Sequence, residues 1–305
     1  MLAYLLHLLV MIGIYSLLAY SLNLLLGFGG LLSFCHAALY GLGAYAYTLA
    51  SIGSSRFGSE ELLITGSLGF LPALLLAALV TSAGALLIAW LSLRFRGDTF
   101  IFATLGFQMI VYVLLYNWSA VTRGAFGIFG VPRPTVLGFD VHEPVEYLLL
   151  VSSLAVLICL VLFLIYRSPF GLSLKALRED ERAAESLGVS AFWSYLTAFG
   201  LSGACAGIAG ALFASYVTYV DPTSFSLGES IFLVTLVLLG GSGNIRGPLA
   251  GVLLMVLLPE LLRFAGLPST AAPNVREILY GAILIVLMYF RPQGLAGEYR
   301  LGGQR

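Results

Sequence analysis

Residues 167–193 read RSPFGLSLKALREDERAAESLGVSAFW and hold one Lys, three Arg, three Glu and one Asp in a chain that is otherwise mostly apolar. The run Ser-Pro-Phe-Gly at 168–171 interrupts the apolar segment before it, and Gly188 supplies a helix stop. The sequence therefore predicts one separate short helix over residues 173–187, outside the apolar segments on either side.

This predicted helix has two different faces when it is drawn on a wheel of about 3.6 residues per turn. The apolar arc holds Ala176, Leu177, Ala183, Ala184 and Leu187. The charged arc holds Lys175, Arg178, Glu181, Arg182 and Glu185. Asp180 falls on the apolar arc and Leu174 on the charged one. Such a helix suits docking into the groove of a partner protein, and the alternative is a helix that lies on the lipid headgroups.

The whole chain has the composition of an integral membrane protein. Hydrophobic residues make up 60% of it, charged residues make up 10%, and the mean hydropathy is +0.99. These values are far outside the range of a soluble domain of this size. Cys35, Cys159 and Cys205 lie inside apolar runs without metal-ligand spacing, so they are expected to pack as free thiols without a disulfide framework.

Apolar segments follow one another along the chain, and about 20 apolar residues suffice to cross a bilayer. The predicted segments are residues 2–26, 31–50, 67–93, 99–118, 147–166, 194–220, 231–239, 249–262 and 278–290. The first follows Met1 without basic residues, which favours a retained span over a removed signal peptide. The sequence therefore predicts an all-α polytopic protein with about 8–9 transmembrane helices, some of them broken by glycine or re-entrant.

Two glycine-rich breaks, at residues 27–30 and 240–247, resemble each other. Each is a glycine cluster between two apolar runs, as LLLGFGGLLSF and LVLLGGSGNIRGPLAGVLL show. Paired broken helices around a central pathway give this pattern in transporters. Two unrelated glycine kinks in packed helices are the alternative interpretation.

Orientation follows from the positions of Lys and Arg, because cytoplasmic loops are enriched in these residues. If residues 167–193 are cytoplasmic, ten of the fifteen basic residues share their side of the membrane. The N-terminus is then outside and the C-terminus inside. The chain is expected to form one transmembrane domain over residues 1–305, with a cytoplasmic loop at 167–193 and a cytoplasmic tail at 291–305.

Polar side chains inside the apolar segments are the candidates for a translocation pathway: Ser33, His36, Gln108, Ser242 and Asn244. Each amide or hydroxyl could instead bond a neighbouring helix, and His36 could be a neutral histidine bonded to a backbone carbonyl. We find no paired intramembrane acids, no metal-ligand cluster and no phosphate-binding loop in the sequence. We therefore expect no enzymatic activity and no cofactor, and energy has to enter through another subunit.

Several motifs in order resemble one known family. They are SLNLLLGFGGLLSFCHAALYGLGAY, RFRGDTFIFATLGFQMI, LREDERAAESLGVSAFWSYLTAFGLSGACAGIAGAL, LVLLGGSGNIRGPLAGVLLMVLLPELLR and YFRPQGL. Together they span nearly the whole chain from about residue 21 to 295, and they are similar to the LivM-type permeases of branched-chain amino acid ABC importers. The sequence departs from the pattern at residues 34–35, Phe-Cys, and at residues 123–126, Arg-Gly-Ala-Phe.

The resemblance implies a type II ABC importer-like permease in a bacterial inner membrane. It places Glu181, Ala183, Ala184 and Gly188 in the family's coupling motif, which receives the motion of a cytosolic ATPase. The motif and the helical wheel together give these coupling candidates: Leu177, Asp180, Glu181, Ala183, Ala184, Leu187 and Gly188. The implied partners are a second permease chain of LivH type, two cytosolic ATPase subunits and a periplasmic substrate-binding protein. Importers of urea, short amides or other amino acids, or a carrier or channel that works alone, are the alternatives.

Overall fold

The computed structural model describes residues 2–52, 67–136, 139–141, 143–264 and a few positions between 281 and 295. The long helices are α1 (Leu2–Asn23), α3 (Phe70–Ser92), α4 (Asp98–Asn117), α6 (Pro144–Arg167), α9 (Ala191–Val217) and α11 (Arg246–Phe264). The shorter ones are α2 (His36–Ser51), α5 (Ser119–Thr122), α7 (Pro169–Glu179), α8 (Glu181–Ser186) and α10 (Leu227–Gly240). The all-α prediction is confirmed.

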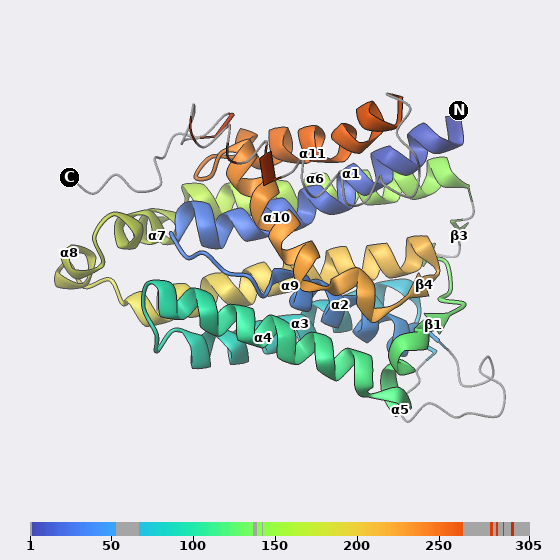
Figure 1. Cartoon of the computed structure of the whole chain (residues 1–305), viewed down its shortest axis with the longest axis horizontal. Helices are drawn as coiled ribbons and strands as arrows, with labels where there is room; N and C mark the ends of the chain where they lie inside the picture. The colour runs from blue at the N-terminus through green and yellow to red at the C-terminus, as the bar shows by residue number, and fades with distance from the viewer. Residues whose placement is uncertain are drawn as a thin grey trace.

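Short irregular elements connect these helices. A π-helical turn, η1 (Leu24–Phe28), continues α1, and two 3₁₀ turns, η3 (Gly124–Phe126) and η4 (Pro222–Phe225), follow α5 and precede α10. Two-residue strands form two antiparallel pairs: β1 (Ile128–Phe129) with β4 (Tyr219–Val220), and β2 (Thr135–Val136) with β3 (Phe139–Asp140). Figure 1 places β1, β3, β4 and α5 at the end of the bundle opposite α7 and α8.

Five helices of the described part are long and apolar enough to cross a membrane. They are Tyr4–Phe28, Phe70–Ser92, Asp98–Asn117, Pro144–Arg167 and Ala191–Val217. The segments predicted at 31–50, 231–239 and 249–262 contain the shorter α2, the interior of α10 and part of α11. The segment predicted at 278–290 lies mainly outside the described residues.

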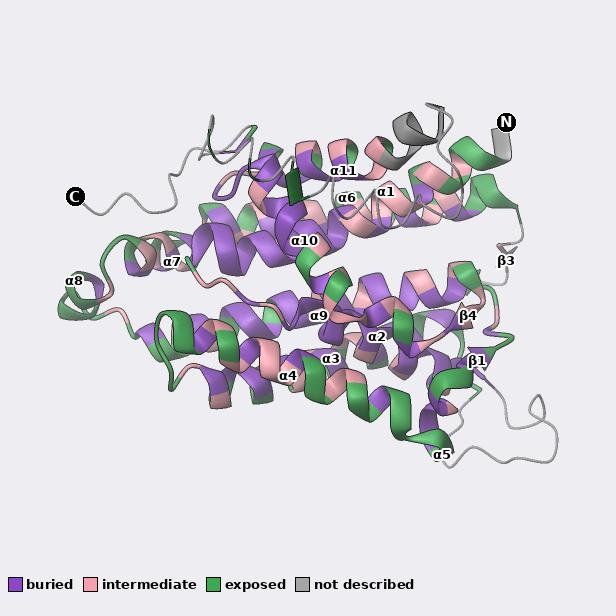
Figure 2. Cartoon of the chain, in the orientation of Figure 1, coloured by how far each residue is buried: buried purple, intermediate pink, exposed green. Residues whose placement is uncertain are grey.

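The helices form two layers that meet along α1 and α9 (Figure 1). One layer contains α1, α6 and α11, the other contains α2, α3, α4 and α9, and α10 runs between them. The Ser202 hydroxyl of α9 donates to the Ser21 carbonyl of α1 at 2.7 Å, which joins the layers. Figure 2 shows buried residues on the faces between helices and exposed residues on the outer faces. Because the exposed residues of α3, α4 and α6 include many large apolar ones, such as Leu79, Phe102 and Leu149, these faces suit contact with lipid.

Glycines at positions 200, 203, 207 and 210 let α9 approach its neighbours closely. A Cβ added at Gly203 would lie 2.4 Å from the Ala85 side chain of α3, and one added at Gly210 would lie 2.3 Å from the Tyr40 carbonyl oxygen of α2. Both distances are too short for any side chain.

Replacing Gly210 by leucine is expected to destabilise the chain by about 1–3 kcal/mol or more, because the side chain collides with backbone of α2. Gly106→Leu on α4 is the matched control, since a Cβ there meets nothing within 4 Å. Thermal unfolding in detergent compares them, and equal unfolding temperatures would contradict this packing.

The first glycine break lies at the end of the bundle beside α7 (Figure 1). After η1 the chain is non-helical from Gly29 to Cys35, and it becomes helical again at His36. Gly30 has φ +70°, a conformation that glycine adopts without strain. The coil turns back toward the middle of the bundle, where α2 begins (Figure 1).

Candidate functional site

The charged loop forms two helices, so the prediction of a single helix over residues 173–187 is wrong. Asp180 separates α7 from α8 with an extended backbone, φ −153° and ψ 105°. Its carboxylate accepts the Ala183 backbone N–H at 3.0 Å and thereby caps α8. Aspartate favours such N-cap positions over helix interiors, which explains the break. Both helices project beyond the long helices at one end of the molecule (Figure 1).

The buried residues of α7 also differ from the apolar arc that the wheel predicts. Leu174, which the wheel places on the charged arc, is fully buried, whereas Ala176 of the apolar arc is exposed. Leu177 is buried as the wheel suggests. Because the chain breaks at Asp180, α7 and α8 pack separately and no single apolar arc runs through both.

Arg178 connects α7 to the first glycine break. Its side chain is only 10% exposed, and its Nη1 donates to the Gly27 carbonyl. A Cβ added at Gly30 would lie 2.6 Å from Arg178 Cγ, so the arginine packs directly on the coil. Lys175 lies 5.0 Å from the centre of the Phe28 ring, at the end of η1. These contacts hold α7 directly against the break.

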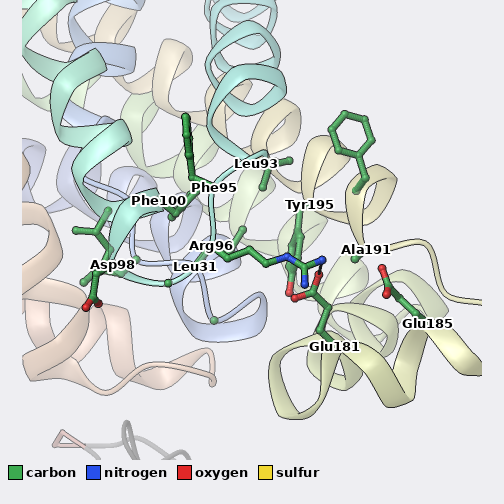
Figure 3. A pocket seen from close by; sticks show the side chains of 15 residues that line it. Leu31, Leu93, Phe95, Arg96, Asp98, Phe100, Glu181, Glu185, Ala191 and Tyr195 are labelled. Carbon is green, nitrogen blue, oxygen red and sulfur yellow. Dashed lines mark ion pairs between the residues drawn. The ribbon is translucent and has the colours of Figure 1, made fainter.

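The inner side of α8 lies against a cavity of about 310 Å³ at the start of α9 (Figure 3). Arg96, from the turn between α3 and α4, forms an ion pair with Glu181 at 3.0 Å, and Glu185 and Tyr195 also line the cavity. The two paired side chains are 71% and 32% exposed, so solvent limits the contribution of this pair to about 0–1 kcal/mol. The pair positions α8 beside the turn between α3 and α4. Ala184 of α8 is buried.

Ala183 of α8, and Leu187 and Gly188 just after it, face solvent. Leu187 is 84% exposed, Ala183 is also exposed, and Gly188 has φ +92° with nothing within 4 Å of a Cβ placed on it. We call Ala183, Leu187 and Gly188 the exposed tip. The exposed tip therefore presents one large apolar side chain, that of Leu187, at the end of the molecule where α7 and α8 lie.

The two glycine breaks are in direct contact through Asn23, at the end of α1. Its Nδ2 donates to the Asn244 carbonyl at 2.9 Å, and its Oδ1 accepts the Gly243 N–H at 3.1 Å. A Cβ at Gly27 would lie 2.4 Å from the Gly243 nitrogen, so glycine is required for this approach. Asn23 itself is fully buried. The similarity of the two breaks in sequence thus corresponds to an actual junction in space.

Gln108, of α4, connects the beginnings of α2 and α10. Its Oε1 accepts the Ala38 N–H at 2.7 Å and the Ser230 hydroxyl at 3.1 Å. Its Nε2 donates to the Phe225 carbonyl at 2.9 Å. These three bonds lead to neighbouring elements of the bundle, which agrees with a polar side chain that bonds adjacent helices.

The other pathway candidates divide between the two breaks. Near the first, the His36 ring nitrogen Nε2 lies 2.8 Å from the Ser21 hydroxyl, a side-chain contact in place of the expected backbone carbonyl, and Ser33 lies 3.1 Å from the Cys35 sulfur. Near the second, Ser242 is buried and Asn244 Oδ1 accepts the Gly247 N–H at 2.6 Å. Ser33 and His36 therefore lie where the first coil ends and α2 begins, and Ser242 and Asn244 lie in the second break.

Sequence reasoning missed the contacts of Asn23, Arg96 and Arg178. An asparagine inside a span and an arginine in a loop helix were visible as residue types. Gly243 lies 220 positions from Asn23, and Gly27 lies 151 positions from Arg178. A single sequence does not indicate pairs that are so far apart.

These features are typical of a polytopic membrane permease: a bundle of apolar spans, two glycine breaks joined by Asn23, and a helix pair at one end attached to the first break. Among the described residues, no group of three or more His, Cys, Asp or Glu could hold a metal ion. The chain belongs to the family of permease components of branched-chain amino acid transport systems, whose profile matches residues 4–288. The family prediction made from the motifs is confirmed.

Individual relatives agree with the family. The chain is 35% identical to the high-affinity branched-chain amino acid transport system permease proteins LivM of Salmonella typhimurium and Escherichia coli K12, over 92% of this chain and 67% of theirs. It is 24% identical to LivH of Salmonella typhimurium, over 93% of this chain and 91% of that one. Members of this family are permeases and not enzymes. No solved structure matches the chain significantly.

Proposed function

We propose that this chain is a transmembrane permease subunit of an ATP-driven importer for branched-chain amino acids, with the 8–9 crossings of a type II importer-like fold. The observation that carries the proposal is the contact of Arg178 with Gly27, because it connects α7, which leads to the exposed tip, to the first glycine break. The names of the LivM and LivH relatives support the substrate class.

The proposed partners are a second permease chain, two ATPase subunits and a periplasmic binding protein. Similarity to both LivM and LivH supports a pairing of two related permeases around the pathway. The exposed tip is the surface offered to an ATPase. The opposite end, with β1, β4 and α5, is the surface offered to the binding protein.

The proposed orientation places α7 and α8 in the cytoplasm of a bacterium whose inner membrane holds the chain. The described basic residues that gather at this end are Arg94, Arg96, Arg167, Lys175, Arg178, Arg182 and Arg246. Arg123 and Arg133 lie toward the other end, near β1 and β2. This asymmetry agrees with the excess of Lys and Arg in cytoplasmic loops.

The proposed mechanism is alternating access driven from the exposed tip. Closure of the ATPase pair displaces α8 and α7 together, and Arg178 transmits the displacement to Gly27. Asn23 then carries it to the second break, so that both breaks change arrangement together. Two discrete arrangements of the joined breaks correspond to pathways open to opposite sides.

Reconstitution in liposomes tests this function. The chain and its second permease alone are expected to give no leucine flux, whereas addition of the ATPases, ATP and binding protein gives uptake. Leucine flux without any ATPase would identify a carrier or channel. ATP-driven uptake of urea or short amides, but not of leucine, would support the importer function and contradict branched-chain amino acids as the substrate.

A further inference from the structure

A second cavity, which we call the basic pocket, lies between α6, α7 and the second glycine break. Its volume is about 700 Å³. It is lined by Phe28, Phe163, Tyr166, Arg167, Lys175, Gly243, Asn244, Ile245 and Arg246. Three of the nine lining residues are cations and none is an acid. Three positive charges around one open cavity repel one another unless an anion lies among them.

Two of the three cations lie over rings, and within the described part of the chain no ion pair joins any of the three to an acid. Arg167 stacks over the Phe163 ring at 4.4 Å, and Lys175 lies 5.0 Å from the centre of the Phe28 ring, so both are fixed by rings of the pocket wall. Arg246 begins α11, where the positive end of the helix dipole adds to its charge. Throughout the described residues, the ion pairs found involve other arginines, Arg96 and Arg178.

The pocket lies beside the exposed apolar face of α6, which suits contact with lipid. Phe163 is half-buried, whereas Leu160 and Leu164 on the same helix are strongly exposed. Arg167 ends α6, at the level where a bilayer changes from acyl chains to headgroups. A ligand with an anionic head and long apolar chains matches this arrangement, with its head among the cations of the pocket and its chains along the exposed apolar side chains of α6.

We propose that the basic pocket binds the phosphodiester headgroup of an anionic membrane phospholipid, whose acyl chains lie along the exposed face of α6. The guanidinium groups of Arg167 and Arg246 bind phosphate oxygens with paired donors, and Lys175 adds a point charge. Basic pockets between transmembrane helices on the cytoplasmic side take such headgroups. The bound lipid would connect α6 and α7 to the second break.

Native mass spectrometry of the delipidated full chain tests the proposal, independently of any transport activity. The probes are phosphatidylglycerol, which is anionic, phosphatidylcholine, which has the same phosphodiester but no net charge, and inorganic phosphate. We expect the chain to retain phosphatidylglycerol over phosphatidylcholine. The double variant Arg167→Gln/Arg246→Gln should weaken phosphatidylglycerol binding about tenfold or more.

Both arginines are exposed, so the double variant is expected to fold, and size-exclusion chromatography verifies it. Should it aggregate, the single variant Arg246→Gln takes its place with a smaller expected loss. Arg94→Gln is the matched control, because Arg94 also lies over a ring, Trp90 at 4.9 Å, but outside the pocket. The control should bind phosphatidylglycerol as the unmodified chain does.

Three results would overturn the proposal. The first is equal phosphatidylglycerol binding by the double variant and the unmodified chain. The second is binding of inorganic phosphate as tight as that of phosphatidylglycerol, which would indicate a site for free anions. The third is displacement of phosphatidylglycerol by added ATPase subunits, which would assign the pocket to an acidic protein surface.

Discussion

Changing Leu187 to glutamate is expected to abolish ATP-driven leucine uptake by the assembled importer while the permease itself stays folded. Leu187 is 84% exposed, so its replacement costs the isolated chain little, within about 0.5 kcal/mol. In the proposed importer the same side chain would lie in the ATPase groove, where an unpaired buried carboxylate costs about 3–5 kcal/mol. Since about 1.4 kcal/mol corresponds to a factor of ten, uptake should fall by about two orders of magnitude or more.

Leu187→Met controls for the side chain itself, because it keeps the size and apolar character and should retain uptake. Initial rates in proteoliposomes, at equal permease content, compare the two variants. Normal uptake by Leu187→Glu would exclude the exposed tip from the ATPase contact.

Changing Asn23 to leucine is expected to separate the two glycine breaks. The substitution leaves the Gly243 N–H and the Asn244 carbonyl without the partner that Asn23 provides, and an unsatisfied buried group costs about 1–3 kcal/mol. Summed over both groups, this loss of unfolding free energy should lower the unfolding temperature of the detergent-solubilised chain by several degrees. In the proposed mechanism α7 would then move only the first break, so ATP-driven uptake should fall as well.

Asn117→Leu is the control, because Asn117 is exposed and the bond found for it is to Val113 of its own helix, at 2.9 Å. It should change the unfolding temperature little. If Asn23→Leu and Asn117→Leu behaved alike in unfolding and in uptake, the junction of the breaks would have no role in stability or transport.

Hydropathy and glycine clusters predict much of this fold. The apolar runs locate α1, α3, α4, α6 and α9 to within a few residues, because a span needs a length of apolar sequence that loops do not have. The break after η1 follows from the clustered glycines at residues 27–30. The close approach of α9 to α2 and α3 follows from its glycine spacing.

The site is less predictable, because its decisive contacts are between residues far apart in the chain. The wheel treats residues 173–187 as one helix, yet capping by Asp180 divides it and turns Leu174 inward. Arg178 belongs to the charged arc by type, but a backbone carbonyl at the break gives its guanidinium a buried partner. Asn23 bonds backbone groups, which carry no signature in the sequence.

Whether the exposed tip meets an ATPase in the cytoplasm can be decided by labelling Leu187→Cys with a membrane-impermeant maleimide, in a chain whose Cys35, Cys159 and Cys205 are replaced by serine. We predict labelling in inverted vesicles stripped of ATPase, protection when the ATPase subunits are added back, and no labelling in right-side-out vesicles. Labelling from the outer side would contradict the proposed coupling, because the exposed tip would then lie where no ATPase can reach it.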